Sequence, residues 1–404
     1  MDYMKFLSHR ISWIEPSPLA KVLGRISELS KAGFKVISLA AGDPDPDVVP
    51  RKILAEISSY VIENIPGSVL YTPTTGVEDL RIELSKFIKE YDGYEAYPEN
   101  IIITSGSTAA LDLLIRILID PGDIVVVENP SYVVSLYAFK QLGANLVGVD
   151  VYSDGIDTYT LEDKIRRLKN EGKKIKLIYT IPTGQNPSGA TMSIDKRRHL
   201  LEIASKYDLL IIEDMAYNYV VLEGSSPPTI KSFDREDRVI PIGTLSKIMG
   251  TGFRVGWVVA TDLIKKYVVS EKQPIDYCAP AISQYIAIEF LRRDVHKISI
   301  ERSREVYRVK RDVMIRSIEE KIREAEFSKP VAGMFLMLRL PNVDGTLFAE
   351  NLMEKYKVAV LPGKPFYTDD KGRDMIRLNF SRPSIDDIKE AVDKIGVLYR
   401  ELKS

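Results

Sequence analysis

The sequence has very little cysteine, histidine or glutamine. Its 404 residues include one cysteine, Cys278, which excludes an internal disulfide, a thiolate zinc cluster and a CxxC redox pair. The three histidines, His9, His199 and His296, are widely separated, so neither a metal site nor a serine–histidine triad is expected. Scarce glutamine beside abundant Lys, Glu, Arg and Ile is typical of a thermophile. Any catalytic site must therefore use other groups.

Long apolar runs and an excess of one charge are also missing. No run approaches the roughly 18 to 20 residues that a membrane helix needs, and residues 1–13 lack the apolar stretch of a signal peptide. Lys and Arg together number 56, against 57 for Asp and Glu, so no bulk positive field attracts a phosphate backbone. We therefore expect a cytoplasmic protein that binds neither membrane nor nucleic acid.

The residues that are present predict an α/β fold. A 45% hydrophobic and 28% charged chain of this length is typical of a globular protein with two or three core-forming units. Continuous β-branched runs alternate with helical patterns, and such runs indicate a mainly parallel sheet covered by helices on both faces. The expected strands are 101–104, 124–127, 176–179, 209–212, 239–242 and 256–259.

The strand pattern weakens after about residue 281. Apolar positions from Val306 to Ile322 predict a long helix that ends near Pro330. A second, α+β lobe follows, with strands expected at 335–340, 358–361 and 376–380 and helices at 346–356 and 384–402. Prolines 44, 46 and 50 indicate an extended crossing between lobes. We expect an N-terminal arm (1–45) packed on a small C-terminal domain (296–404), and a large domain (46–295).

A candidate anion site follows the first of these strands. Leu111, Leu114, Ile115 and Leu118 have the spacing of a helix with one buried stripe, so a helix should begin near Ser107. The preceding residues, Thr104-Ser105-Gly106-Ser107-Thr108, place hydroxyls and backbone N–H groups at its N-terminus. A phosphate would fit there. An ordinary helix N-cap explains the same residues equally well when they are taken alone.

The segment from Gly243 to Trp257 contains a lysine in unusual company. Lys247 follows a buried strand and is flanked by hydroxyl residues rather than by other charges. Desolvation there would lower its pKa and make it an amine nucleophile that forms a Schiff base. Thr244, Ser246 and Arg254 could then hold a phosphate, the arginine in bidentate fashion.

Further polar groups follow other strand ends. Asp214 lies at the carboxyl end of a predicted strand, on the usual ligand side of an open α/β sheet. It could instead be a helix N-cap or part of a buried ion pair. The loop 182–189, Pro-Thr-Gly-Gln-Asn-Pro-Ser-Gly, also leaves a strand end, and by itself it could be a plain turn.

Taken together and in this order, these segments resemble fold-type I pyridoxal-phosphate enzymes, specifically class I/II aminotransferases. The resemblance runs from Pro16 to Arg382. The phrases ISLAAGDPDP, PTGQNPSG, EDMAY and GTLSKIMGTGFRVGW are similar to the subgroup of kynurenine, 2-aminoadipate and broad-specificity aromatic aminotransferases. The resemblance implies a large domain with a mainly parallel, seven-stranded type of sheet covered by helices. It also implies a smaller α+β domain and no metal.

The resemblance also implies roles around the ring of pyridoxal 5′-phosphate. Lys247 would hold the cofactor as a Schiff base and later carry a proton between the substrate Cα and the cofactor C4′. Asp214 would keep the pyridine nitrogen protonated, so that the ring stays an electron sink. Asn186 and Tyr217 would donate hydrogen bonds to the ring's phenolate oxygen. Tyr132 would stack on the ring face.

The implied phosphate and substrate contacts complete the site. Arg377 would clamp the substrate α-carboxylate, and the Gly42 backbone would contact the same group. Asn186 would be a further substrate contact. Family members often have glutamine or alanine where Thr108 stands, so its backbone N–H matters more than its hydroxyl. Tyr71 would reach the site of a neighbouring subunit, which implies an obligate homodimer. The implied phosphate ligands are Ser107, Thr108, Thr244, Ser246, Arg254 and the neighbouring subunit's Tyr71.

The substrate expectation rests on a departure from the family pattern. Members that choose dicarboxylic side chains commonly have an arginine shortly after the Pro-Ser pair, where this chain has Ala20, and Arg25 is the nearest arginine. We therefore expect aromatic donors, with 2-aminoadipate or other amino acids also possible. A ping-pong reaction would pass the amino group to 2-oxoglutarate.

Two alternatives use the same fold. Lys247, Asp214 and Tyr217 would also serve β-elimination, decarboxylation or a ring-forming synthase, because the fold does not fix the reaction. An effector-binding module of a transcription regulator would need about 60 further basic N-terminal residues. Residues 1–41 show no helix-turn-helix pattern, which favours the enzyme.

Overall fold

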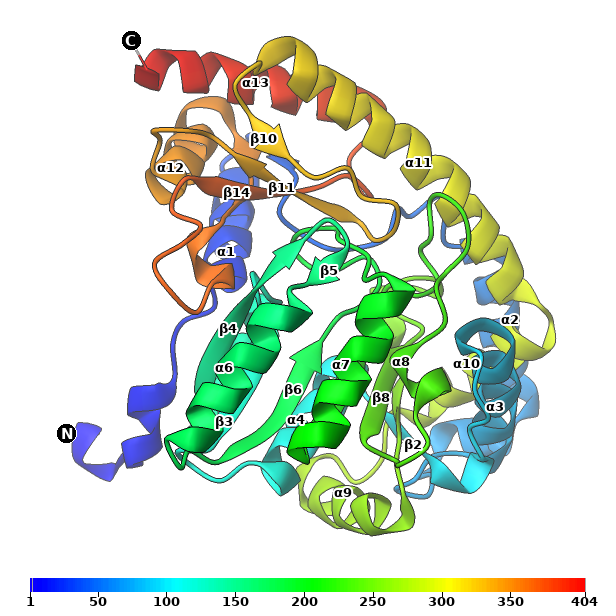
Figure 1. Ribbon diagram of the computed structural model, residues 1–404. Coiled ribbons are helices and arrows are strands. Elements are labelled where there is room, and N and C mark those ends of the chain that lie inside the picture. The colour runs from blue at the N-terminus through cyan, green and yellow to red at the C-terminus, as the bar shows by residue number, and fades with distance from the viewer. Residues whose placement is uncertain (2, 404) are drawn as a thin grey trace.

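The computed structural model describes residues 1 and 3–403. Its larger part is built on an eight-stranded sheet with the order β2-β9-β8-β7-β6-β3-β4-β5 (Figure 1). Strand β9 is antiparallel to both its neighbours and the short β5 is antiparallel to β4, whereas the other pairs are parallel. This confirms the α/β fold with a mainly parallel sheet. The strands are β2 (Ile101–Thr104), β3 (Ile124–Asn129), β4 (Asn145–Tyr152), β5 (Gly155–Ile156), β6 (Ile175–Thr180), β7 (Leu210–Asp214), β8 (Val239–Thr244) and β9 (Gly256–Val259).

Helices cover both faces of this sheet because its strands are apolar on both sides. Along β3, Val125 and Val127 belong to one hydrophobic cluster, while Ile124 and Val126 belong to another, as the alternation of a strand requires. Helices α6 and α7 lie in front of the sheet in Figure 1, and α4 lies behind it. The helices of this part are α2 (Arg51–Asn64), α3 (Glu78–Asp92), α4 (Ser107–Leu118), α5 (Val133–Gln141), α6 (Thr158–Asn170), α7 (Ile194–Tyr207), α8 (Ile230–Phe233), α9 (Asp262–Ile275) and α10 (Ala281–Arg292).

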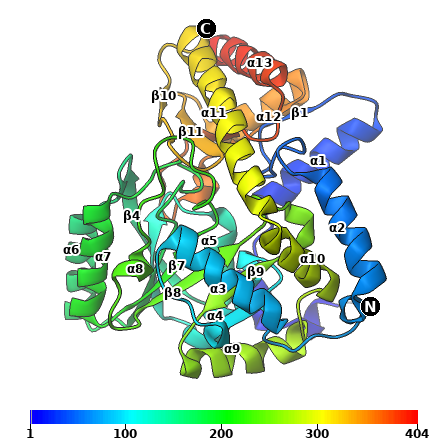
Figure 2. The same cartoon turned by 90° about the vertical axis from the view of Figure 1, so that its right-hand side faces the viewer.

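The C-terminal lobe has its own antiparallel sheet, with the order β10-β11-β14-β13. Helix α11 runs up the molecule from α10 to this lobe and packs beside α13 there (Figure 2). The elements are α11 (Val295–Lys321), β10 (Glu326–Phe327), β11 (Phe335–Arg339), α12 (Gly345–Tyr356), β12 (Val358–Ala359), β13 (Leu361–Pro362), β14 (Met375–Asn379) and α13 (Ile385–Lys403).

Two expectations for this lobe are wrong. The long helix ends at Lys321 rather than near Pro330, because residues 326–327 pair with β11 as strand β10. Residues 358–361 do not form one strand. The chain changes sheets at Val360, so that β12 pairs with β1 (Ile37–Ser38) and β13 pairs with β14.

The N-terminal segment contacts the C-terminal lobe. Helix α1 (Pro18–Lys31) starts after Ser17, whose hydroxyl accepts from the backbone N–H of Ala20, as is usual for an N-cap. Arg25 on α1 forms an ion pair with Glu354 on α12, and β1 pairs with β12. The domain boundaries at residues 45/46 and 295/296 stay a prediction.

The proline-rich crossing after β1 is fastened to α11. The hydroxyl of Tyr307 accepts from the backbone N–H of Asp45 at 2.8 Å, and Lys310 forms a buried ion pair with the Asp45 carboxylate. The hydroxyl of Ser381, just after β14, donates to the carbonyl oxygen of Asp43 at 2.7 Å. These contacts fix the position of Gly42 at the start of the crossing.

The remaining described elements are short. They are the 3₁₀ turns η1 (Met4–Phe6), η2 (His9–Trp13), η3 (Pro66–Val69), η4 (Pro98–Asn100), η5 (Thr251–Phe253) and η6 (Lys364–Phe366). Across residues 1 and 3–403, no helix is both long and apolar enough to span a bilayer.

Candidate active site

A cavity of about 190 Å³ lies at the carboxyl ends of the parallel strands, and it collects most of the predicted site residues. The carboxyl ends of β2, β6, β7 and β8 meet at this edge, and β9 begins there because it is antiparallel. The lining residues are Ser107, Thr108, Tyr132, Ile181, Asn186, Asp214, Ala216, Tyr217, Thr244, Ser246, Lys247, Thr251 and Arg254.

One end of the cavity gathers donors for an anion. Helix α4 begins at Ser107, and the first N–H groups of a helix lack intrahelical partners. The Arg254 guanidinium lies against this turn and donates to the carbonyl oxygen of Ser105 at 3.0 Å. Gly106 has φ +92°, and a Cβ there would lie 2.4 Å from Arg254 Nη2, so only glycine lets the guanidinium approach the helix start.

Two hydroxyls complete this end. Thr244 is the last residue of β8, and its hydroxyl donates to the Ser246 hydroxyl oxygen at 2.8 Å. Arg254 Nη1 also lies 3.4 Å from that oxygen. A guanidinium, hydroxyls and a helix N-terminus therefore converge on one spot, which is the donor set that a phosphate dianion needs.

Lys247 occupies the middle of the cavity. Its Nζ donates to the carbonyl oxygen of Gly42 at 2.9 Å and lies 5.7 Å from the centroid of the Tyr217 ring. Burial lowers the pKa of this ammonium to about 8, against the opposing attraction of Asp43. About a tenth of the amine is therefore uncharged at about pH 7, and this fraction is able to attack a carbonyl carbon.

Asp214 is a buried carboxylate at the end of β7. The hydroxyl of Tyr179 donates to its Oδ2 at 2.9 Å, and the backbone N–H of Ala216 donates to its Oδ1 at 3.2 Å. Burial raises the pKa of Asp214 to about 6, although these hydrogen bonds and Lys247 favour the ionised form. Such a carboxylate is suited to a cationic partner.

Two further donors face the same space. Asn186 Nδ2 donates to the hydroxyl oxygen of Tyr217 at 3.4 Å, and both side chains are buried. Burial raises the pKa of the Tyr217 phenol well above its usual value, so the hydroxyl keeps its proton. Burial also raises the pKa of Tyr132. The nearby Asp214 carboxylate raises this pKa further, whereas a hydrogen bond with Thr108 lowers it.

Arg377 brings a buried cation from the C-terminal lobe. Its Nη1 donates to Asn186 Oδ1 at 2.9 Å and its Nη2 donates to the carbonyl oxygen of Ala40. The guanidinium stacks 4.1 Å from the centroid of the Phe335 ring, and burial lowers its pKa to about 10. Among the described residues its Nε has no hydrogen-bond partner, so the arginine has capacity for an anionic ligand.

Gly42 is required by packing as well as by the site. A Cβ at this position would lie 2.7 Å from the Phe335 ring, which clashes with normal contact distances. The glycine therefore lets the crossing segment lie flat on Phe335 and present its carbonyl oxygen to Lys247. Its predicted contact with a substrate carboxylate is not tested by this geometry.

Tyr71 and Arg25 lie outside the cavity. The Tyr71 side chain is 86% exposed and makes an edge contact with Tyr277, so one chain does not bring it to the other site residues. Arg25 is tied to Glu354 and Glu28 on the outer surface, and Ala20 is exposed on α1.

In and around the cavity lie residues that the sequence did not single out. Ile181 and Ala216 lie at the ends of β6 and β7, where the carboxyl-end rule could have found them. Glu128 is fully buried at the end of β3, and its carboxylate accepts from Gln185, the neighbour of Asn186. Phe335 could not have been found, because only the packing of the C-terminal lobe brings it under Arg377.

Comparisons with known proteins agree with this geometry. A family model described as aminotransferase class I and II matches residues 35–395. An uncharacterised aminotransferase of Saccharolobus solfataricus is 41% identical over 98% of both chains, and aromatic-amino-acid aminotransferase 1 of Thermococcus litoralis is 36% identical over 99% of this chain and 95% of its own.

Solved structures are similar over the whole chain. A crystal structure of an archaeal alanine:glyoxylate aminotransferase has a TM-score of 0.97 and 56% identity, covering 99% of this chain and 100% of its own. Kynurenine aminotransferase of Pyrococcus horikoshii, solved with PMP, has a TM-score of 0.93 and 34% identity, covering 100% and 99%. The chain therefore belongs to the class I and II aminotransferases, a family that depends on pyridoxal 5′-phosphate.

Proposed function

We propose that this protein transfers the amino group of an amino acid to a 2-oxo acid by a ping-pong reaction. The observation that carries the proposal is Lys247, whose amine has a lowered pKa and lies in one cavity with a phosphate-type donor set and the buried Asp214. A cofactor with a phosphate and a ring nitrogen accounts for both the donor set and Asp214 beside this lysine.

The residues present fit the family cofactor. Its phosphate would lie at the start of α4 beside Arg254, its ring nitrogen would face Asp214, and Lys247 would hold it covalently. When bound, the cofactor supplies an electron sink for negative charge on the substrate Cα. Asn186 and Tyr217 would supply hydrogen bonds to the ring oxygen, and Tyr132 would pack on the ring.

The chain's own groups do the remaining work. As a free amine, Lys247 would take the proton from the substrate Cα and hold it on Nζ until it is returned. Arg377 holds the α-carboxylate and so aims the Cα hydrogen at Lys247. In this proposal residues 46–295 hold the cofactor, whereas residues 1–45 and 296–404 supply Gly42 and Arg377.

For the substrate, we propose donors without a negative side chain, aromatic ones first. Lys247, Arg254 and Arg377 each have a role at the cofactor or at the α-carboxylate. Arg25, the nearest N-terminal arginine, is engaged by Glu354. A second carboxylate therefore gains no dedicated cation from these groups, so 2-aminoadipate should be a weaker donor. We keep 2-oxoglutarate as the expected acceptor, bound chiefly through its α-carboxylate.

The similar archaeal structure named for alanine and glyoxylate widens the substrate panel. A small donor needs only the α-carboxylate clamp that Arg377 supplies in this proposal. We therefore include alanine among the donors and glyoxylate among the acceptors.

We also propose a homodimer in which Tyr71 of the partner subunit completes each phosphate site. A large aromatic side chain that is 86% exposed supports this, since such residues are common at interfaces. Sedimentation at assay concentration tests it: we expect a dimer, and an active monomer would contradict it. A cytoplasmic location in a thermophile remains the expectation that composition supports.

Initial-rate kinetics test the proposed reaction. With purified protein, pyridoxal 5′-phosphate, phenylalanine and 2-oxoglutarate, double-reciprocal plots at several acceptor concentrations should be parallel. Intersecting lines would contradict a ping-pong transfer. Replacing the donor by tyrosine, kynurenine, alanine or 2-aminoadipate, and the acceptor by glyoxylate, ranks the substrates. A preference for 2-aminoadipate by more than about a hundredfold in kcat/KM would overturn the substrate proposal.

A further inference from the structure

Arg197 is a fully buried arginine outside the cavity. It lies on α7, and its side chain has no exposed surface. Its neighbour on the same helix, Arg198, is exposed and stacks on the Phe233 ring at 4.9 Å. A charged side chain is costly to bury, so the environment of Arg197 must supply compensating groups.

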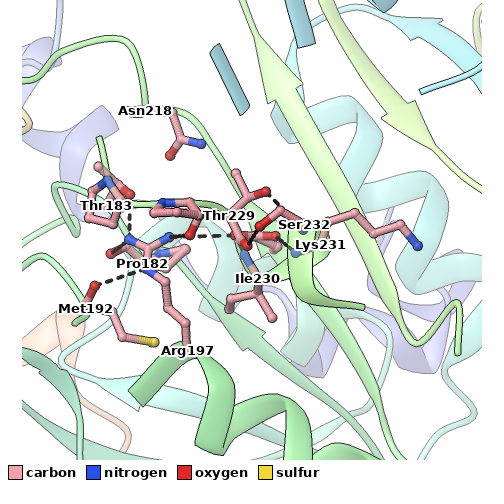
Figure 3. A network of polar contacts seen from close by, with 12 residues as sticks. Pro182, Thr183, Met192, Arg197, Asn218, Thr229, Ile230, Lys231 and Ser232 are labelled. Atoms are coloured by element: carbon pink, nitrogen blue, oxygen red, sulfur yellow. Dashed lines mark hydrogen bonds and ion pairs between the residues drawn. The ribbon is translucent and has the colours of Figure 1, made fainter. Parts of the chain in front are cut away.

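Those groups come from the two ends of one loop. Arg197 Nε donates to the carbonyl oxygen of Met192 at 3.0 Å. Its Nη2 donates to the carbonyl oxygen of Pro182 and to the hydroxyl oxygen of Thr183, each at 2.8 Å. In Figure 3 the guanidinium lies between these loop residues on one side and Thr229 to Ser232 on the other.

The loop in question, residues 182–192, carries Asn186. Its base is closed by one backbone hydrogen bond, from the N–H of Met192 to the carbonyl oxygen of Pro182 at 2.7 Å. Arg197 bonds both of these residues and is thus a second closure of the same base. Between its two closed ends, the loop places Asn186 so that its amide forms hydrogen bonds with Tyr217 and Arg377.

On its other side Arg197 faces the strand that carries Asp214. Glu213 is fully buried next to Asp214 in the chain, and its Oε1 lies 4.0 Å from Arg197 Nη1. The Glu213 carboxylate accepts from the backbone N–H groups of Ile230 at 2.8 Å and Lys231 at 2.9 Å. Arg197 also donates to the carbonyl oxygen of Pro228 at 3.3 Å.

From these contacts we propose that Arg197 is a positioning residue, whose guanidinium fixes the loop that carries Asn186 to the end of β7 that carries Asp214. The proposal rests on the proposed function, because Asn186 would serve the ring oxygen of the cofactor and Asp214 would serve its ring nitrogen. The planar fork is essential to it, since one ammonium cannot reach all of these acceptors. Burial lowers the pKa of Arg197 to about 10, so it remains charged at neutral pH.

The primary test compares Arg197→Lys with Arg198→Lys. The first variant keeps the buried charge beside Glu213 but loses the fork, and the second is a matched change on the exposed face. Apoprotein fluorescence gives the affinity for pyridoxal 5′-phosphate. We expect Arg197→Lys to weaken it by about tenfold or more, while Arg198→Lys stays within about twofold of the parent protein.

A pH titration of cofactor absorbance provides a signature that general loss of stability does not produce. A donor from Asn186 favours the anionic ring oxygen, so loosening it should raise the pH midpoint of the loaded protein by about half a unit or more in Arg197→Lys. Arg198→Lys should keep the parent midpoint. An unchanged midpoint in Arg197→Lys would overturn the proposal.

A double-mutant cycle decides whether Arg197 acts through Asn186. If it does, adding Arg197→Lys to Asn186→Ala should reduce kcat by no more than about twofold further. Losses that multiply would mean that Arg197 only stabilises the fold, and would contradict the proposal. Thr183→Val, which removes one acceptor and leaves no charge unpaired, covers the case in which Arg197→Lys does not fold: it should move the same midpoint upward.

The outcomes separate this inference from the proposed function. If the unmodified protein binds no pyridoxal 5′-phosphate, the proposed function fails. If it binds the cofactor and Arg197→Lys behaves like Arg198→Lys, only the positioning role fails.

Discussion

The two ends of the candidate site are assembled in different ways. At the anion-binding end, Ser107, Thr244, Ser246 and Arg254 come from the adjoining ends of β2, β8 and β9, and Arg254 bonds the loop before α4 directly. At the other end of the site, next to the cavity, Arg377 meets Asn186 and Ala40, which lie 191 and 337 residues away in the chain. The first end belongs to one sheet edge, whereas the second exists only when separate segments pack together.

In the proposed function, this difference separates cofactor binding from substrate binding. In the proposed function the phosphate needs no group from the C-terminal lobe, because Thr244, Ser246 and Arg254 lie together at the sheet edge. The substrate end depends on the crossing segment and on β14. Lys247 connects the two, since it follows β8 and donates to Gly42 in the crossing. Substitutions at each end should therefore have distinguishable kinetic effects.

The largest effect is expected at Lys247, which connects the two ends. Lys247→Ala removes both the covalent attachment and the proton carrier, so transamination should fall by about a thousandfold or more. Steady-state rates with phenylalanine and 2-oxoglutarate measure this. Lys266→Ala, on the exposed face of α9, is the matched control and should retain the parent rate. Activity of Lys247→Ala within about tenfold of the parent would exclude Lys247 as the attachment site.

The next effect belongs to the cofactor end. Asp214→Asn removes the negative charge opposite the ring nitrogen, and we expect kcat to fall by about a hundredfold together with cofactor affinity. Tyr179→Phe removes only a donor to Asp214 Oδ2. It should raise the pKa of Asp214 further and reduce kcat by about tenfold. Parent-like rates in both variants would mean that another acid serves the ring.

A smaller and different effect is expected at the substrate end. Arg377→Lys keeps a cation but loses the fork for the α-carboxylate, which should raise KM for the amino donor by about thirtyfold, or about 2 kcal/mol. Cofactor affinity should not change, in contrast to Asp214→Asn. Arg339→Lys, on the neighbouring strand β11 with ion pairs to Glu326 and Asp374, is the control. A loss of cofactor affinity in Arg377→Lys would contradict the separation of the two ends.

The smallest effect concerns pH. In the proposed function only the uncharged amine of Lys247 would attack the cofactor, and burial lowers its pKa to about 8 in the protein without cofactor. The rate of covalent attachment to apoprotein should therefore rise about fivefold from about pH 7 to 8 and then level off above about pH 9. Stopped-flow absorbance measures it. A rate that keeps rising about tenfold per unit up to about pH 10 would indicate an ordinary lysine.

Much of the sheet and of the anion-binding end could be predicted from sequence. Continuous β-branched runs are unambiguous when a strand is buried on both faces, and every strand predicted for the large sheet is present. Strand β4 was missed because Gly148 and Asp150 interrupt its apolar pattern and most of its residues are only partly buried. The lysine and hydroxyl residues near β8 were found because they are consecutive in the chain.

The other end was less predictable because it depends on distant packing. The apolar pattern of α11 continues to Ile322, and only the pairing of β10 with β11 shows where the helix must stop. The break at Val360 depends likewise on β1 and β14 as competing partners. Arg377 was assigned through the family resemblance alone. Nothing in the sequence around Phe335 indicates that its ring lies against the Arg377 guanidinium. The roles of these side chains stay predictions.

The most direct test of the account is the first half of the reaction, followed without any acceptor. When phenylalanine is added to cofactor-loaded protein, the cofactor absorbance should change once and about one equivalent of 2-oxo acid should form per subunit. Adding 2-oxoglutarate should then restore the original spectrum and yield glutamate. Continuous release of ammonia or carbon dioxide in the absence of acceptor would contradict transamination and indicate elimination or decarboxylation instead.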